Sequence, residues 1–75
     1  KVIPECDEEG TVVVKIYVNQ NGSVIKAIPG EKGTIGDSCL YDAARKTALS
    51  HKWPADPKAP LKQIGFVIVD FTVRQ

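Results

Sequence analysis

The side chains with the most obvious chemistry in this chain are its two cysteines, Cys6 and Cys39. A structural zinc site needs about four Cys or His ligands at short spacings. The sequence offers only one histidine besides two widely separated cysteines, so we expect no metal site. In an oxidising compartment the pair could instead form one disulfide bond, worth ~3–4 kcal/mol on the chain-entropy model. The alternative is that Cys39 is a small helix residue and Cys6 a free thiol in a frayed tail.

No arrangement of side chains indicates an enzyme. The single histidine, His51, has Asp42, Ser50 and Asp56 as polar neighbours in sequence, which is not the pattern of a nucleophile, a base and an orienting acid. We interpret His51 as a helix-end residue that interacts with the C-terminal helix dipole. The carboxylates of the N-terminal segment lie outside any expected pocket for acid–base catalysis. We therefore expect no catalytic residue and no cofactor.

The charge balance argues against nucleic acid as a partner. Ten basic and nine acidic side chains leave a net charge of +1, far from the strongly basic surface that binds phosphates. Gly30 to Gly33 has the spacing of the GXXG loop of KH domains. A predicted hairpin rather than a helix precedes it, however, and Glu31 adds negative charge where a phosphate would lie. We interpret these glycines as loop residues.

Length and composition bound the architecture. With 75 residues, of which 43% are hydrophobic and 25% charged, the chain can form one folded domain and no more. Residues 1–9 carry four acids against one lysine, so we expect an acidic lead-in there and the folded domain over residues 10–75. The sequence shows neither a signal-peptide pattern nor an apolar run of the ~20 residues that cross a bilayer.

Two β-strands joined by a tight turn are expected at the start of the domain. Thr11 to Asn19 is rich in β-branched residues and reads as a half-buried strand. Asn21-Gly22 follows, the strongest short-range hairpin signal, since both residue types tolerate positive φ. A second strand runs from Ser23 to Ile28 and is ended by Pro29-Gly30. The glycine-rich residues 29–36 predict a mobile loop.

A helix is expected after this loop. Asp37 and Ser38 offer N-cap oxygens. The helix should end near Lys52 or Trp53, because Pro54 disfavours helical geometry in the residue before it, and Trp53 should plug one end of the core. A stripe of mostly small residues recurs at helical spacing and predicts close contact with a sheet. The stripe consists of Leu40, Ala43, Ala44, Thr47 and Ala48.

The longest apolar run, Ile64 to Val73, predicts a third strand. The order strand, tight hairpin, strand, helix, strand indicates an α+β fold, a two-layer ββαβ sandwich in which one helix covers one face of a three-stranded antiparallel sheet. If the third strand returns beside the first, the sheet order is 2-1-3 and the third strand is an edge. Its alternation places one set of side chains on the core face and the other outward. The core set is Val67, Val69, Phe71 and Val73, and the outward set is Phe66, Ile68, Asp70 and Thr72.

The edge strand is the candidate binding site. A long exposed strand invites pairing with another chain unless charge, proline or a cover blocks it, and the open sheet face around Val13 and Tyr17 would add an apolar patch. We therefore expect an extended peptide or a second copy to pair with this edge. The alternative is that residues 1–9 or the C-terminal Arg74-Gln75 fold over it. The site comprises Ile64, Gly65, Phe66, Val67, Ile68, Val69, Asp70, Phe71 and Thr72.

Over about residues 10–74 the chain resembles the TonB C-terminal domain family. The run G-T-V-V-V-K-I-Y-V-N-Q-N-G-S-V-I-K-A, Gly10 to Ala27, looks like the first hairpin of that family. Leu40 to Ala55 resembles its helix, with a leucine, paired alanines and an aromatic-Pro exit, and Ile64 to Val73 resembles its last strand. The loop from Pro29 to Thr34 is similar to that of a subgroup.

The resemblance implies a non-enzymatic, periplasmic module of an energy transducer. Such modules are tethered to the inner membrane by an N-terminal helix and a Pro-rich spacer, and they work with the motor proteins ExbB and ExbD. They bind the TonB box of outer-membrane transporters as a strand added to the last strand of the domain, here Ile64 to Thr72. The chain departs from many members in having Ile3-Pro4-Glu5-Cys6 where they carry Tyr-Pro, and it shows neither anchor nor spacer.

A different class of function would use the same edge strand. A structural or sensory interaction domain could self-associate as a homodimer, or bind another envelope protein, with no link to transport. Pairing of exposed strand edges is the physical basis of both readings.

Overall fold

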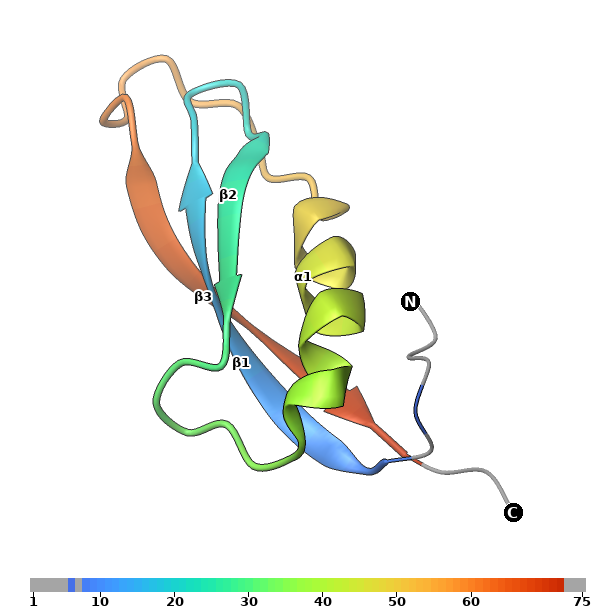
Figure 1. Ribbon diagram of the computed structural model, residues 1–75. Coiled ribbons are helices and arrows are strands. Elements are labelled where there is room, and N and C mark those ends of the chain that lie inside the picture. Colours follow the sequence, from blue (N-terminus) through green and yellow to red (C-terminus); the bar gives the residue numbers. More distant parts are fainter. Residues whose placement is uncertain (1–5, 7, 73–75) are drawn as a thin grey trace.

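The computed structural model describes Cys6 and residues 8–72, so Asp7 and Val73, among others, lie outside the described residues. Its elements are β1 (Gly10–Val18), β2 (Val24–Pro29), the 3-10 helix η1 (Ser38–Leu40), α1 (Tyr41–Leu49) and β3 (Gln63–Phe71). The strands form an antiparallel sheet in the order β2-β1-β3, and α1 covers one face of it (Figure 1). The predicted α+β fold, its ββαβ order and its 2-1-3 sheet are confirmed. In the described part of the chain no helix is long and apolar enough to span a membrane.

One face of the central strand β1 forms the floor of the core. Val12, Val14 and Ile16 are fully buried, whereas the residues between them are half-buried on the opposite face. The core face of β3 adds Val67, Val69 and Phe71, as the alternation predicted. The helical side of the core is the predicted stripe of small residues, which is buried throughout. It consists of Leu40, Ala43, Ala44, Thr47 and Ala48.

The loop between β2 and η1, which the sequence predicts to be mobile, is hydrogen-bonded along β1. Thr11 and Ile35 exchange two backbone hydrogen bonds of 2.7 and 2.8 Å. The Glu31 N–H donates to the Val13 carbonyl oxygen at 3.1 Å, and the Val13 N–H donates to the Thr34 hydroxyl at 3.0 Å. The loop therefore pairs with the first half of β1, where β2 does not reach.

The helix α1 ends at Leu49, before the predicted end at residues 52–53. The Ser50 hydroxyl donates to the Thr47 carbonyl oxygen at 2.6 Å, and His51 Nδ1 lies 2.9 Å from the same oxygen. These side chains satisfy a carbonyl that a further helical turn would otherwise use, so the helix can stop here. His51 thus lies at the C-terminal end of the helix, where its position in the sequence suggested.

The chain after α1 is hydrogen-bonded to the turn between β1 and β2. Lys52 forms an isolated bridge with Ser23, and the Trp53 N–H donates to the Gly22 carbonyl at 2.9 Å. Gly22 has a φ of 82°, and a Cβ placed on it would lie 1.8 Å from the Trp53 carbonyl oxygen, so only glycine fits. Trp53 itself is 42% exposed. The prediction that it plugs the core is wrong, because its backbone is fixed to the turn outside the buried cluster.

The burial of Leu40 predicts a large loss of stability on truncation. Leu40 is 0% exposed at the junction of η1 and the sheet, whereas Leu61 is 78% exposed. We expect Leu40→Ala to lower the free energy of unfolding by about 2–5 kcal/mol, because it removes buried methyl groups and leaves a cavity. The matched variant Leu61→Ala should change it by less than about 0.5 kcal/mol. Urea unfolding followed by circular dichroism measures both, and equal losses would contradict this account of the core.

Candidate functional site

The two edges of the sheet differ in how well they resist pairing with another chain. The β2 edge has six residues, ends in Pro29 and carries a register shift where β1 passes from Tyr17 to Val18. The β3 edge has nine residues and pairs with β1 over its full length without a shift. Shortness, proline and bulges protect an edge, and β3 has none of them. Among residues 8–72 no strand lies beyond β3.

The hydrogen bonds of β1 fix the direction of the backbone groups in β3. Val13 uses both its N–H and its C=O toward the loop on the β2 side. Residues opposite each other in an antiparallel pair alternate between bonded and non-bonded pairs, so Val13 and its partner Ile68 form a non-bonded pair. The backbone N–H and C=O of Ile68 consequently point away from β1, out of the sheet. By the same alternation those of Ile64 and Phe66 do too.

The same three residues turn their side chains away from the helix. Ile64, Phe66 and Ile68 are 58%, 59% and 66% exposed. Asp70 continues the row and accepts a hydrogen bond of 2.7 Å from the Thr11 hydroxyl on β1. The other members of the predicted site face the core or lie just beyond the strand. Gly65 is half-buried, Val67, Val69 and Phe71 are buried, and Thr72 is exposed after the end of β3.

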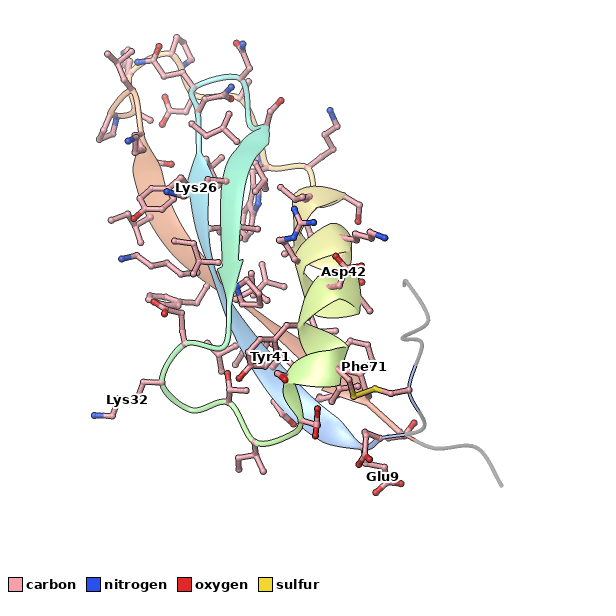
Figure 2. The ribbon with its side chains drawn as sticks, viewed as in Figure 1. Glu9, Lys26, Lys32, Tyr41, Asp42 and Phe71 are labelled. Carbon is pink, nitrogen blue, oxygen red and sulfur yellow. A yellow bond between two sulfur atoms is a disulfide. The ribbon has the colours of Figure 1, made fainter. Side chains whose placement is uncertain are left out.

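The open face of the sheet combines this apolar row with positive charge. The ammonium groups of Lys15, Lys26 and Lys62 lie 5.6, 5.8 and 5.3 Å from the centroid of the Tyr17 ring. Each is within the range of a cation–π contact. Figure 2 shows Lys26 and the loop residue Lys32 on the side of the sheet away from α1. Sequence alternation alone did not reveal this cluster, because Lys26 meets Tyr17 only through the pairing of β2 with β1.

A small apolar cleft lies on the other face, beside the start of β3. It has a volume of about 130 Å³. The cleft was missed from sequence, although an isolated glycine in an apolar strand is a signal for a close approach by another group. Its walls come from β1, from β3 and from the segment after α1. They are Ile16, Val18, Trp53, Gln63, Ile64 and Gly65.

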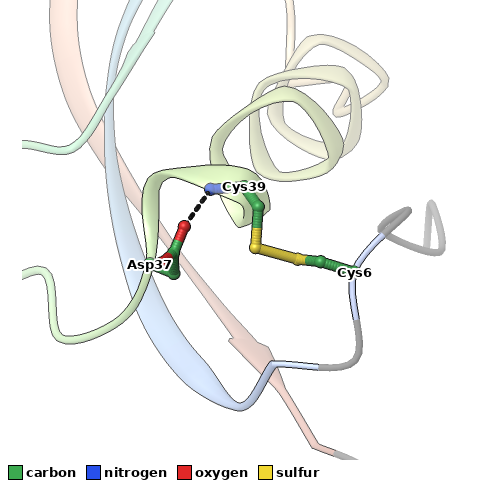
Figure 3. The surroundings of a disulfide bond; sticks show 3 residues. All are labelled: Cys6, Asp37 and Cys39. Carbon is green, nitrogen blue, oxygen red and sulfur yellow. Dashed lines mark hydrogen bonds between the residues drawn. A yellow bond between two sulfur atoms is a disulfide. The ribbon is translucent and has the colours of Figure 1, made fainter.

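A disulfide bond joins Cys6 to Cys39, with 6.2 Å between the two Cα atoms (Figure 3). Cys39 lies in η1, where its N–H donates to the Asp37 carboxylate at 2.8 Å. Cys6 is half-buried and packs against the hydrophobic core. The disulfide therefore attaches the acidic lead-in to the start of the helix. Of the lead-in, the structure describes Cys6, Glu8 and Glu9, and none of the three belongs to a β-strand. Arg74 and Gln75, the other segment that could cover the edge, lie outside the described residues.

A small network of ion pairs lies on the surface of α1. Asp42 on α1 binds Lys46 at 3.1 Å and Arg45 at 3.3 Å. The hydrogen bond from Lys46, followed by that from Arg45, holds the pKa of Asp42 below its ordinary value. All three side chains are exposed, so this network contributes little to stability. Over the described residues, no group of three or more His, Cys, Asp and Glu side chains could hold a metal ion.

The disulfide predicts a redox-dependent stability. We expect the double variant with Cys6→Ser and Cys39→Ser to unfold with about 3–4 kcal/mol less free energy than the oxidised protein, because its unfolded chain is no longer cross-linked. Thermal unfolding with and without reductant measures the effect. Reductant should lower the melting temperature of the parent protein and leave that of the double variant unchanged. A parent protein insensitive to reductant would contradict the prediction.

In comparisons with known proteins, no family model, no curated protein and no solved structure matches this chain. What the domain binds must therefore follow from the chemistry of its own surface. That surface offers a strand edge with which no strand of residues 8–72 pairs, an apolar and positively charged face, and a small cleft beside the same strand.

Proposed function

We propose that this domain binds an extended segment of another protein as a strand added to β3. The observation that carries the proposal is the edge of β3, where the backbone groups of Ile64, Phe66 and Ile68 point out of the sheet and no proline or bulge protects them. In strand addition, main-chain hydrogen bonds supply affinity and alternate side chains supply specificity. The outward row formed by Ile64, Phe66, Ile68 and Asp70 would make the selective contacts.

We further propose that the partner is the TonB box of an outer-membrane transporter, and that the chain is the periplasmic domain of a TonB-like energy transducer. The resemblance of residues 10–74 to that family supports this, as does a disulfide, which persists in oxidising compartments such as the periplasm. ExbB and ExbD would act through a region N-terminal to this chain that tethers it to the inner membrane. The domain would transmit force and would need neither catalysis nor a cofactor.

A homodimer is the second candidate, and the exposed apolar row of β3 favours it. Two antiparallel copies of β3 could pair about a two-fold axis, because the same patch would then serve both subunits. Such a dimer would cover Ile64, Phe66 and Ile68, which are each more than half exposed in the single chain. Binding of a transporter segment and dimerisation would compete for one edge.

The direction of the backbone in β3 gives a sharp test of strand addition. The Ile68 N–H points away from β1, so Ile68→Pro removes a hydrogen-bond donor from the edge and no hydrogen bond from the pairing with β1. We expect this variant to fold and to lose at least about tenfold in affinity for TonB-box-like peptides. Amide chemical-shift titration of the labelled domain measures the affinity, and shifts of the parent protein should concentrate in residues 63–72 and in β1.

The matched control is Ile68→Thr, which shortens the side chain and keeps the N–H. It should bind the peptides far better than the proline variant, provided that both give a native-like spectrum. Equal binding by a folded proline variant and the parent protein would contradict strand addition. Sedimentation of the parent protein without peptide tests the second candidate, since a concentration-dependent dimer that Ile68→Pro abolishes would move the assignment to self-association.

A further inference from the structure

The cleft beside β3 lies where the helix leaves the sheet uncovered. α1 packs mainly against β2 and β1, and Figure 1 shows the first half of β3 away from the helix. The core face of β3 is buried from Val67 onward, but Gln63 remains exposed and Gly65 is half-buried. The cleft of about 130 Å³ occupies this uncovered region. A strand added to β3 would lie beside the strand that forms one wall of the cleft.

Gly65 lines the cleft. Its surroundings are open enough that a larger residue could occupy this position. A Cβ placed on it would meet the Ile16 side chain at 3.5 and 3.6 Å, which is ordinary van der Waals contact. Gly65 also lacks the positive φ that favours glycine at Gly22. Glycine inside a strand weakens the strand, and it commonly marks a site where another group approaches closely. The missing side chain leaves space beside Ile16 that a neighbouring strand can fill.

Trp53 forms a fixed wall of this space. Its N–H is bonded to the Gly22 carbonyl at 2.9 Å, so the turn between β1 and β2 holds the residue in place. The side chain is nevertheless 42% exposed beside the cleft. A large aromatic side chain that is partly exposed on a fixed backbone offers an apolar contact surface.

The pairing of β3 determines which partner residue reaches the cleft. Gly65 is opposite Ile16, one position from the non-bonded pairs, so its backbone groups bond to β1. In an antiparallel added strand, the residue opposite Gly65 would then form a non-bonded pair with it, the arrangement in which side chains are closest. That residue would point to the core face, toward Trp53. Aromatic side chains on a neighbouring strand are known to cover glycines of edge strands.

We propose that this cleft binds an aromatic side chain of the segment that adds to β3. The inference rests on the strand addition proposed above. The volume of the cleft, about 130 Å³, is close to that of the ~150 Å³ apolar cavity that holds one benzene ring. On the opposite face the ammonium groups of Lys15, Lys26 and Lys62 surround Tyr17. The preferred partner is therefore an extended segment with an aromatic residue on one face and acidic residues beside it.

The test compares two synthetic peptides in which Thr alternates with Ala between glutamate ends, one of them with a central Ala replaced by Phe. We expect the Phe peptide to bind the parent domain roughly tenfold more tightly. Trp53 is the single tryptophan of the chain, so its fluorescence should shift to the blue as the ring is covered. Gly65→Val fills the cleft from its floor and suits a strand. It should remove the preference for Phe, so that the two peptides bind this variant with equal affinity.

Ile68→Thr changes the opposite face of the same strand and serves as the matched control, which should keep the preference for Phe. If both peptides bind the parent domain equally, or if Gly65→Val retains the preference, the cleft assignment is overturned while strand addition stands. If neither peptide binds, this inference is overturned, and the comparison of Ile68→Pro with Ile68→Thr then decides strand addition separately.

Discussion

The central position of β1 is the constraint on which the rest of the structure depends. One edge of β1 pairs with β3 over its whole length, and the other pairs first with the loop around Ile35 and then with β2. One face of the strand is fully buried under the helix. Because β1 is hydrogen-bonded along both edges and buried on one face, the register of the strands that pair with it is fixed. The backbone groups of Ile64, Phe66 and Ile68 point outward as a result of this pairing. Val13, for example, bonds with its N–H and C=O to the loop after β2, so its partner Ile68 forms no hydrogen bond with it.

The two faces of β3 have separate roles as a result of the strand's two-residue period. Ile64, Phe66 and Ile68 turn both backbone groups and side chains outward, to the edge and to the open face. Val67 and Val69 hold the strand to the core. Gly65 belongs to the second set by position but contributes no side chain, so the core face is incomplete there. A strand added at the edge of β3 would extend the sheet. Its side chain opposite Gly65 would complete the core face.

The sequence predicted most of the fold because each element has a strong local signal. The alternation of β1, the Asn21-Gly22 turn and the alanine stripe of α1 each depend on neighbours a few residues away. The features that were missed depend on contacts between distant segments. After the helix, residues 52–53 bond to the β1–β2 turn, and the loop after β2 bonds to β1. That β3 lies at an edge was predictable from the strand order. The cleft and the lysines around Tyr17 could be found only once the pairing of the strands was known.

The pairing of Gly10 with Phe71 places the two ends of the folded domain side by side. β1 is synthesised first and β3 last. β1 can therefore pair with β3 only after almost the entire chain has been made. Such non-local pairing raises the contact order and slows folding. Cys6 and Cys39 both precede β3, so their bond can close around an incomplete sheet and shorten the search that remains. The last strand to be made is thus the strand that presents the exposed edge, and a chain cut before it would lose part of its core together with that edge.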